Sequence, residues 1–277
     1  MNLTDISLVS RSGKYAPTIE DIAELSEVDS LPPGGFPLTH RMGEVCGMAP
    51  GKRVLVVSSA QGDQALYYVE NFRVDVVGID ISDYMIGVSR RQAFARGLQD
   101  RATFERGDAQ ALPYADSTFD IVVNEGAVGI PERPIDVLSE MVRVAKVGGQ
   151  ICFRESIWLK PLAAEEKLEL SEHYGTCPLE EREWISLIES LGVAETVSEI
   201  DRWSKPEYFW EVRKDRTVQS HEAIYSLAEK LKVGKKIYQR FGREGLEQVK
   251  LNEAVFYGAV RDRKIGYGMF KGTKIVR

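Results

Sequence analysis

The sequence predicts an α/β protein built on a doubly wound, mostly parallel sheet of seven strands. From Arg53 to Glu155, apolar runs rich in β-branched residues alternate with segments of helical pattern. Repeated strand–helix units of this kind assemble into a parallel sheet with helices on both faces. Polar residues follow the apolar runs, and ligands bind at the carboxyl ends of the strands in such a sheet. These strand-end residues are Ser58, Asp80, Asp108, Asn124, Glu125 and Glu155.

Residues 1–50 precede the first strand, and we expect them to form a helical lead-in. Thr18 is a suitable cap for a short helix that runs to Leu25. The run Leu31-Pro-Pro-Gly-Gly-Phe36 is expected to break any helix, and a helical pattern resumes from Leu38 to Cys46. The Pro-Gly run is either a plain tight turn or a segment that folds over a ligand.

The remaining elements follow from pattern and spacing. Strands are expected at residues 53–57, 74–79, 102–106, 119–124, 150–155 and 194–200 and within 265–274. Helices are expected from residue 65, at 84–96, at 135–145 and at 178–191. Two or three further helices are expected within residues 204–250. The predicted organisation is a lead-in (1–50), an α/β domain (51–202), a helical lid for the substrate (203–262) and a final strand that returns to the sheet (263–277).

The stretch from Arg53 to Gln64 organises the chain. A buried strand is followed by the small residues Ser58, Ser59 and Ala60, then by Gly62 and a helical pattern. Small residues let the backbone approach a ligand closely, and a helix N-terminus offers unpaired N–H groups. The next predicted strand ends in Asp80, at the spacing from which an acid accepts hydrogen bonds from a ribose. Loop and acid together indicate a cofactor that carries a nucleoside.

Four motifs in this order resemble the class I S-adenosylmethionine-dependent methyltransferases. They are Val54-Leu55 with Gly62, the run Gly78-Ile-Asp-Ile-Ser82, the run Gly107-Asp-Ala-Gln-Ala-Leu-Pro113 with Phe119-Asp120, and Gly148-Gly149. The sequence is most similar to the small-molecule branch that includes quinone-ring, sterol and arsenite methyltransferases. The resemblance covers roughly residues 50–202 and the last strand, and residues 107–122 are its most specific part. The segment from Leu31 to Cys46 also looks like the lead-in of some microbial methyltransferases.

The resemblance implies a Rossmann-like methyltransferase fold and S-adenosyl-L-methionine as cofactor, with S-adenosyl-L-homocysteine as product. By position, Asp80 would accept both ribose hydroxyls, and Asp108 the adenine amino group. Ala109 would offer its N–H to a ring nitrogen, and either Met85 or Tyr84 would pack on the adenine unless it packs in the core. The implied cofactor contacts are Ser58, Ser59, Ala60, Gln61, Gly62, Asp80, Ile81, Met85, Asp108, Ala109 and Glu125.

The first loop departs from the family's pattern. The family usually has an acid at Val56, which helps to hold the cofactor's ammonium, and glycines at Ser58 and Ala60. Serine can replace glycine if its φ stays negative, and its hydroxyl would then be available to the amino-acid end of the cofactor. Binding through other groups, weakened binding, and a fold kept for another purpose are the three possible outcomes. Because Asp80 and Asp108 are both present, we expect binding to be retained.

Two residues are candidates for catalysis, Glu125 and His173. Glu125 either contacts the cofactor's ammonium, acts as a base, or forms a surface salt bridge. His173 lies after the fifth strand, where this fold often receives its acceptor, although an isolated histidine is most often an ordinary one. An oxygen or nitrogen nucleophile needs a base, for which Glu155 is a third candidate, whereas a carbon or sulfur nucleophile needs little help from a base.

The sequence shows no metal-binding spacing. His40, His173 and His221 are isolated from one another. Cys46, Cys152 and Cys177 are few and widely spaced, which indicates a reducing compartment without a disulfide framework. A thiophilic acceptor such as arsenite near Cys177 is a minor alternative to plain packing.

The composition further limits the class of protein. A net charge of −6 argues against a general nucleic-acid binder. No apolar run reaches the length of a membrane span, and the first residues lack the pattern of a secretory signal. We therefore expect a cytoplasmic monomer or homodimer that acts on a small-molecule acceptor.

The last quarter differs in composition. From Trp203 onward it holds 17 Lys and Arg against 9 Asp and Glu. This excess forms either solvated helix faces or a basic lid that attracts an anionic partner. The aromatic residues of the same region either pack its helices or line a lid over an apolar acceptor.

Three rival functions are compared with methyl transfer to a small molecule. The altered first loop favours a catalytically silent binding or assembly protein of the same fold. The basic last quarter favours a methyltransferase that acts on a macromolecule. A nicotinamide-dependent oxidoreductase is disfavoured, because the chain lacks a Gly-x-Gly-x-x-Gly run and contains Gly107-Asp-Ala109.

Overall fold

The structure is a computed structural model that describes residues 17, 19–26, 30–131, 133–205, 210, 212–215 and 225–275. Within them, the main sheet consists of β2 (Arg53–Val57), β3 (Asp75–Asp80), β4 (Ala102–Arg106), β5 (Phe119–Glu125), β6 (Ala145–Trp158), β7 (Val193–Glu199) and β9 (Ile265–Lys274). The strands lie in the order β4-β3-β2-β5-β6-β9-β7. β9 is antiparallel to β6 and β7, and the other pairings are parallel. The predicted fold class is confirmed.

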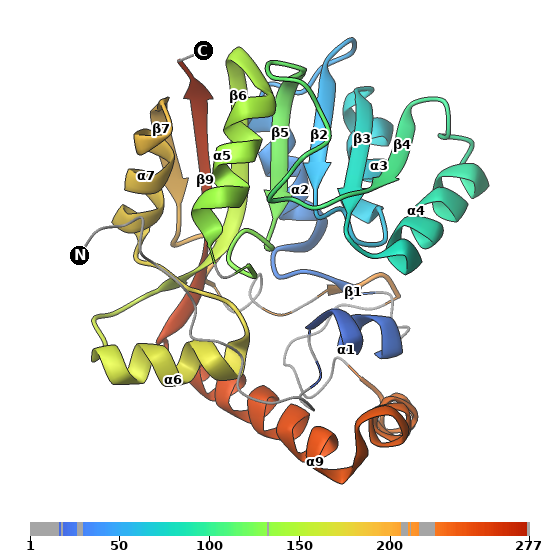
Figure 1. The fold of residues 1–277 in the computed structure, drawn as a ribbon, viewed down its shortest axis with the longest axis vertical. Coiled ribbons are helices and arrows are strands. Elements are labelled where there is room, and N and C mark those ends of the chain that lie inside the picture. The colour runs from blue at the N-terminus through green and yellow to red at the C-terminus, as the bar shows by residue number, and fades with distance from the viewer. Residues whose placement is uncertain are drawn as a thin grey trace.

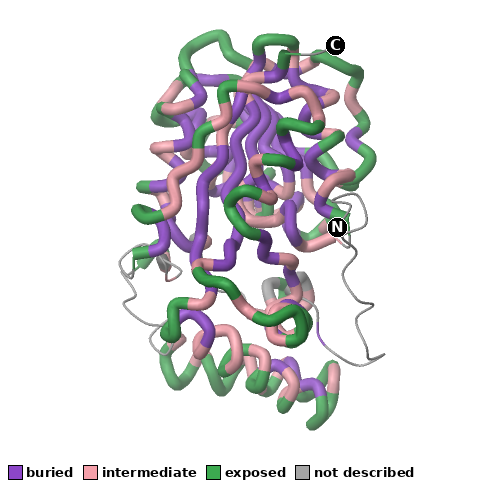
Figure 2. Tube along the Cα trace, turned by 90° about the vertical axis from the view of Figure 1, so that its left-hand side faces the viewer, coloured by how far each residue is buried: buried purple, intermediate pink, exposed green. Residues whose placement is uncertain are grey.

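Helices cover both faces of this sheet (Figure 1). One face packs against α2 (Gly35–Val45), α3 (Asp63–Phe72) and α4 (Asp83–Ala95). The other packs against α5 (Pro134–Val144) and α7 (Glu181–Ser190). Because both faces are covered, β2 is apolar along its whole buried length: Val54 and Val56 belong to the first core, Leu55 and Val57 to the second. Figure 2 shows the strands as a buried layer between exposed helix surfaces.

A further group of helices lies beyond the carboxyl ends of the parallel strands, at the lower edge of the sheet in Figure 1. It consists of α1 (Ile19–Ser26), α6 (Ala164–Tyr174) and α9 (Leu227–Arg261). Both α1 and α6 pack on α9. α9 bends at Gly242, where φ is 71° and ψ is −168°. This layer stands beside the sheet edge at which doubly wound proteins bind ligands.

The lead-in differs in one respect from its prediction. Residues 31–36 were expected to break any helix, but α2 already begins at Gly35. Gly34 adopts φ 95° and caps the helix, and Pro37 lies in the first turn, where its missing N–H breaks no helical hydrogen bond. The prediction is therefore wrong for the last residues of this run. Thr18, the predicted cap of α1, lies outside the described residues.

The segment between β7 and β9 also differs. Its described part holds two helical stretches, which form α9 on either side of the non-helical Gly242, in agreement with the prediction, and a short strand that was not predicted, β8 (Val212–Arg213). β8 pairs antiparallel with β1 (Ser30–Leu31) and so joins the lead-in to the insertion. α6 was not predicted. Two of the aromatic residues of the insertion, Tyr208 and Phe209, lie outside the described residues. The division of the chain into four parts stays a prediction. None of the described helices combines the length and apolarity needed to cross a membrane.

Candidate functional site

The loop between β2 and α3 has a left-handed backbone at three positions. φ is 55° at Ser58, 45° at Ala60 and 85° at Gly62. The condition under which serine could replace glycine without strain, a negative φ, is therefore not met at Ser58. A Cβ atom in this region costs about 1–2 kcal/mol per residue, so Ser58 and Ala60 hold strain that glycines would avoid. Ser58 and Ala60 thus adopt a backbone conformation that favours glycine, although neither is a glycine.

Gly62 is the position where glycine is required. Its φ of 85° favours glycine, and a Cβ atom there would lie 2.9 Å from both the Phe104 ring and the Ser89 side chain. α4 also holds the carbonyls of the loop. Ser89 Oγ donates to Ala60 O at 2.8 Å, and Gln92 Nε2 donates to Gln61 O at 3.0 Å. The close packing of α4 and β4 therefore fixes the shape of this loop.

Asp80 ties the loop to the end of β3. Its Oδ2 accepts a hydrogen bond from the Ala60 N–H at 2.9 Å, and its Oδ1 accepts one from the Ser82 N–H at 2.9 Å. Asp80 thus stands at the sheet edge beside the loop, as predicted, and its role toward a ribose stays a prediction.

One hydroxyl of the loop is buried without a partner. Ser59 is 2% exposed, and its Oγ has no hydrogen-bond partner among the described residues. Buried polar groups are normally hydrogen-bonded, so an orphan hydroxyl of this kind marks a place for a bound ligand or water. The loop residues therefore fit the cofactor that the sequence implies, although through a different set of groups.

The predicted adenine end is more open. Asp108 is exposed, and its Oδ1 accepts a hydrogen bond from the Gln110 N–H at 2.9 Å, which forms a local turn. Ala109 packs against the core beside α5. Ile81 and Tyr84 expose apolar surface next to Asp80, with 57% and 41% of their area accessible. An adenine ring bound at this edge would contact the apolar surfaces of Ile81 and Tyr84.

Met85 follows the core-packing alternative. It is buried, and its N–H donates to Ser82 Oγ at 3.3 Å, which caps α4. Tyr84 is therefore the better placed of the two residues to contact an adenine.

Glu125 points inward between α2 and α3. Its Oε2 accepts a hydrogen bond from Thr39 Oγ1 at 2.9 Å, and its Oε1 accepts one from Tyr68 OH at 2.8 Å. Burial raises the pKa of this carboxyl group above its ordinary value. Neighbouring Asn124 fixes the strand end, since its Nδ2 donates to Val57 O at 3.1 Å. Glu125 is thus a partly buried acid that hydrogen bonds hold between the lead-in and the sheet, not a partner in a surface salt bridge.

The sequence analysis missed Arg154 on β6. Arg154 is 3% exposed, its Nη2 donates to Glu125 O at 3.2 Å, and its guanidinium carbon lies 4.4 Å from the centroid of the Tyr267 ring. A charged pair, Arg154-Glu155, inside an apolar strand was the available signal. Glu155 accepts hydrogen bonds from the N–H groups of Gly129 and Ser156, and burial raises the pKa of its carboxyl group.

His173 lies apart from these acids, at the end of α6. Its Nδ1 is 2.9 Å from Asn252 Oδ1 on α9, a contact that joins the two helices. The next residue, Tyr174, places its hydroxyl 2.5 Å from that of Tyr267 and stacks on Phe256 with ring centroids 4.2 Å apart. The structure therefore brings Tyr174, rather than His173, toward Arg154.

The described residues contain no group of three side chains suited to hold a metal ion. Cys46 and Cys152 are buried in the same core. Burial raises the pKa of the Cys177 thiol to about 11, so this thiol stays protonated at neutral pH. A protonated thiol is a poor ligand for a thiophilic acceptor.

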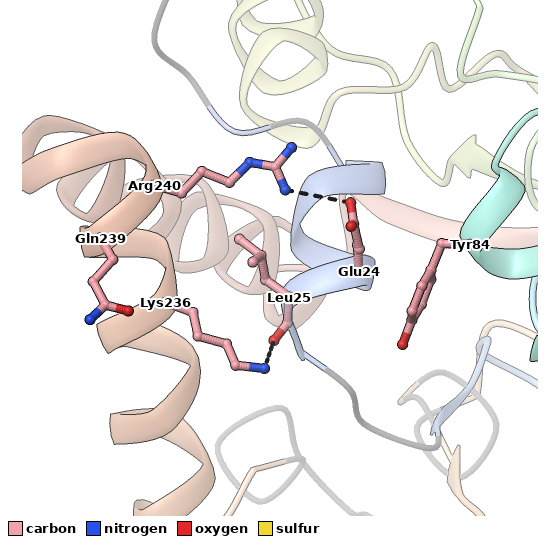
Figure 3. Close-up of a pocket in the computed structure, with 6 residues that line it drawn as sticks. All are labelled: Glu24, Leu25, Tyr84, Lys236, Gln239 and Arg240. Carbon is pink, nitrogen blue, oxygen red and sulfur yellow. Dashed lines mark hydrogen bonds and ion pairs between the residues drawn. The ribbon is translucent and has the colours of Figure 1, made fainter.

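A pocket of about 440 Å³ lies between α1 and α9 and reaches the start of α4 (Figure 3). Its lining residues are Glu24, Leu25, Tyr84, Lys236, Gln239 and Arg240. Lys236 Nζ donates to Leu25 O at 3.3 Å, and Arg240 pairs with Glu24 at 3.4 Å. Through Tyr84 the pocket adjoins the apolar surface beside Asp80.

Comparisons with known proteins show which family the residues around this sheet edge resemble. Residues 55–153 match the model of a family described as a methyltransferase domain. Over these residues the chain is thus similar to S-adenosylmethionine-dependent methyltransferases. Among curated relatives, Methyltransferase GfsG of Streptomyces halstedii is 32% identical over 133 residues, which is 48% of each chain. A demethylmenaquinone methyltransferase of Renibacterium salmoninarum is 33% identical over 152 residues, 54% of this chain and 61% of the relative.

The chain spans about half to three fifths of the length of these relatives. Solved structures agree on the fold. A putative sarcosine dimethylglycine methyltransferase from Galdieria sulphuraria matches with a TM-score of 0.67 at 17% identity, over 87% of this chain and 85% of that one. The [4+2]-cyclase SpnF matches with a TM-score of 0.61 at 20% identity, over 87% and 82%. At these identities the likeness shows the fold alone.

Proposed function

We propose that this protein transfers the methyl group of S-adenosylmethionine to a small-molecule acceptor and releases S-adenosylhomocysteine. The observation that carries the proposal is the first loop, whose left-handed backbone at Ser58, Ala60 and Gly62 is fixed by the carboxylate of Asp80. Strained backbone of this kind clusters at active sites and ligand-binding sites. The relatives named as methyltransferases support the same reaction.

The residues that would hold the cofactor lie along the edge of the sheet. Asp80 would accept hydrogen bonds from the ribose, and Ile81 and Tyr84 would flank the adenine, with Asp108 at its outer side. The loop from Ser58 to Gly62 would lie against the amino-acid end. Val56 is buried in the core and offers no acid to the cofactor's ammonium. Glu125, at the end of the adjacent strand, would take that place.

When bound, the sulfonium supplies a methyl group that is already activated for displacement. The chain's own residues then have to align the acceptor and exclude water, and such alignment contributes roughly 7–11 kcal/mol. The layer of α1, α6 and α9 beside the sheet edge is placed to do this, with residues 1–50 and 203–262 closing over the acceptor. Glu125, whose carboxyl pKa is raised, is the first candidate to take a proton from an oxygen or nitrogen nucleophile, and His173 is the second.

The remaining expectations belong to the same proposal. A net charge of −6 and the relatives' names support a small molecule as acceptor, with no nucleic acid involved. Three free cysteines suit the cytoplasm. We propose a monomer or a homodimer.

Titration calorimetry with S-adenosylmethionine and S-adenosylhomocysteine tests the cofactor site. The unaltered protein is expected to bind both. Asp80→Ala is expected to bind at least tenfold more weakly, because it loses charge-assisted hydrogen bonds worth about 1.5–3 kcal/mol and an anchor of the loop. Asp75→Ala, at the opposite end of the same strand, is the matched control and is expected to bind normally. No heat with either ligand, for the unaltered protein, would favour the silent binding module instead.

A further inference from the structure

Arg154, on β6 near the carboxyl ends of the parallel strands, is a buried cationic side chain with two unused donor nitrogens. Its Nε and Nη1 are buried and have no hydrogen-bond partner among the described residues. Only Nη2 is engaged, with the carbonyl of Glu125. Burying hydrogen-bond donors of a charged group without partners is costly, and such groups mark ligand sites more often than stable packing.

The neighbouring residues are arranged to seat this guanidinium. A Cβ atom on Gly126 would lie 1.9 Å from Arg154 Nη2, and Gly126 adopts φ 95°, so glycine is needed there. On its other side the guanidinium lies over the Tyr267 ring. Tyr267 in turn meets the hydroxyl of Tyr174 from α6. The seat is therefore built from β5, β6, β9 and α6.

Two acids share the region, but each has its own partners. Glu125 accepts from Thr39 and Tyr68, and Glu155 accepts from backbone N–H groups. Burial raises the pKa of both carboxyl groups, whereas an arginine stays charged. Within the described part of the chain, neither acid forms an ion pair with Arg154. The Arg154 charge lowers the pKa of both carboxyl groups and partly offsets the effect of burial, but its Nε and Nη1 have no hydrogen-bond partner among the described residues and so can bind a ligand.

We infer that Arg154 binds a carboxylate of the methyl acceptor, which makes that acceptor an organic acid. This inference rests on the proposed methyl transfer and adds the class of substrate. Guanidinium–carboxylate hydrogen bonds are among the strongest that a neutral-pH site can offer. A phosphate monoester carries close to two negative charges and would meet one guanidinium between two acids, so a monoanion fits better.

The position favours the acceptor over the carboxylate of the cofactor. Apart from Glu125 on β5, the residues expected to hold the cofactor follow β2, β3 and β4, and β6 lies on the far side of β5 from all three. Adjacent strands are about 4.8 Å apart, so β6 lies about 10 Å from the first loop. Arg154 faces β9 and α6, with the stacked rings of Tyr174 and Phe256 beyond. These rings favour an acid with a flat or apolar body.

The test compares matched acids and amides in the presence of saturating S-adenosylhomocysteine. Calorimetry with benzoate and benzamide, and with phenylacetate and phenylacetamide, is run on the unaltered protein, Arg154→Met, Arg154→Lys and the control Arg101→Met. The unaltered protein and the control are expected to prefer at least one acid over its amide by at least tenfold. Arg154→Met is expected to lose this preference. Arg154→Lys, which keeps the charge and guards against misfolding of the methionine variant, is expected to keep only part of it.

A second measurement observes the guanidinium directly. The Nε–H resonance of Arg154, assigned by its absence from Arg154→Lys, is expected to shift on addition of benzoate and not of benzamide. Equal affinities of acids and amides for the unaltered protein, or a preference that persists in Arg154→Met, would overturn the inference.

Titration with S-adenosylhomocysteine shows whether Arg154 binds the carboxylate of the acceptor or the carboxylate of the cofactor. S-adenosylhomocysteine is expected to bind Arg154→Met within threefold of the unaltered protein; a loss of more than tenfold would assign Arg154 to the cofactor and overturn the inference. If the unaltered protein binds no S-adenosylhomocysteine, the proposed function fails, while the benzoate titration without it still reports on Arg154.

Discussion

At the scale of single residues, the first loop shows how a sequence can keep a backbone shape without its usual residues. Ser58 and Ala60 both carry a Cβ atom at positive φ. The strain of about 1–2 kcal/mol at each is offset by the contacts that fix the loop, namely those from Asp80 and Ser89. The geometry is therefore set by the neighbours of the loop rather than by the conformational preference of its own residues.

Ala60→Gly is expected to raise the free energy of unfolding by about 1 kcal/mol. It removes strain of about 1–2 kcal/mol, while the greater freedom of glycine in the unfolded chain costs only about 0.4–1 kcal/mol. Ala95→Gly is the control, because Ala95 is exposed and lies in regular helix at the end of α4. It is expected to lose about 0.5–1 kcal/mol, since glycine is unfavourable in a helix and there is no strain to release. Urea unfolding of the unaltered protein and the two variants measures both changes in the free energy of unfolding. An equal loss of stability in the two variants would show that Ala60 is unstrained.

Glu125 makes stability depend on pH in a stated direction. Its folded pKa is raised above the ordinary value of 4.5, mainly by burial. The folded protein therefore binds more protons than the unfolded chain between pH 4.5 and the raised pKa. The stabilising contribution of Glu125 is present below pH 4.5 and is lost as the pH rises through the folded pKa.

Glu125→Gln removes this titration. The free energy of unfolding of the variant, minus that of the unaltered protein, is expected to increase as the pH rises from about 4.5 and then to level off. Urea unfolding at a series of pH values measures it, with the exposed Glu244→Gln as control. A difference that stays flat with pH in both variants would contradict the burial of an ionisable group at Glu125.

At the scale of elements, the bend in α9 decides how the insertion reaches the rest of the molecule. The half after Gly242 packs on α6, and His173 joins it through Asn252. The half before Gly242 contacts α1, where Arg240 pairs with Asp21 at 3.0 Å. A straight helix of the same length would serve only one of these partners, so the bend allows one element to cover the sheet edge from both sides.

Two glycines of α9 are expected to respond to alanine with opposite signs. Gly242 adopts φ 71° and ψ −168°, a region that only glycine visits readily, so Gly242→Ala is expected to lose about 1–3 kcal/mol of stability. Gly258 lies in regular helix with open space around a Cβ atom, so Gly258→Ala is expected to gain about 0.5–1 kcal/mol. Thermal unfolding compares the two, and a gain for both would mean that α9 is straight in solution.

At the scale of the whole molecule, the basic last quarter is paired with acidic parts of the chain. Lys214 lies 2.7 Å from Asp63 at the start of α3, and Lys264 lies 2.7 Å from Glu166 on α6. Arg240 reaches α1 in the same way. These ion pairs join the insertion to the lead-in and the α/β domain. They account for part of the charge asymmetry without a macromolecular partner.

Binding of S-adenosylhomocysteine is expected to stabilise the whole fold. A ligand at 100 times its dissociation constant adds about 2.7 kcal/mol, which for a protein of this size corresponds to a rise in Tm of about 5–10 °C. Differential scanning calorimetry measures this rise. The same ligand concentration is expected to raise the Tm of Asp80→Ala much less. An equal rise in Tm for both proteins would show that Asp80 does not contribute to binding of the ligand.

The sequence by itself determined the seven strands and the residues at their carboxyl ends, including Asp80, Asp108 and Glu125. These follow from local periodicity and from the alternation of strands and helices, which contacts between distant segments do not change. Only the tertiary structure decided the positive φ of Ser58, the pairing of β1 with β8 and the seat of Arg154. Each of these depends on residues far apart in the chain, such as Arg154 with Tyr267 or Glu125 with Thr39, whose proximity no local pattern encodes.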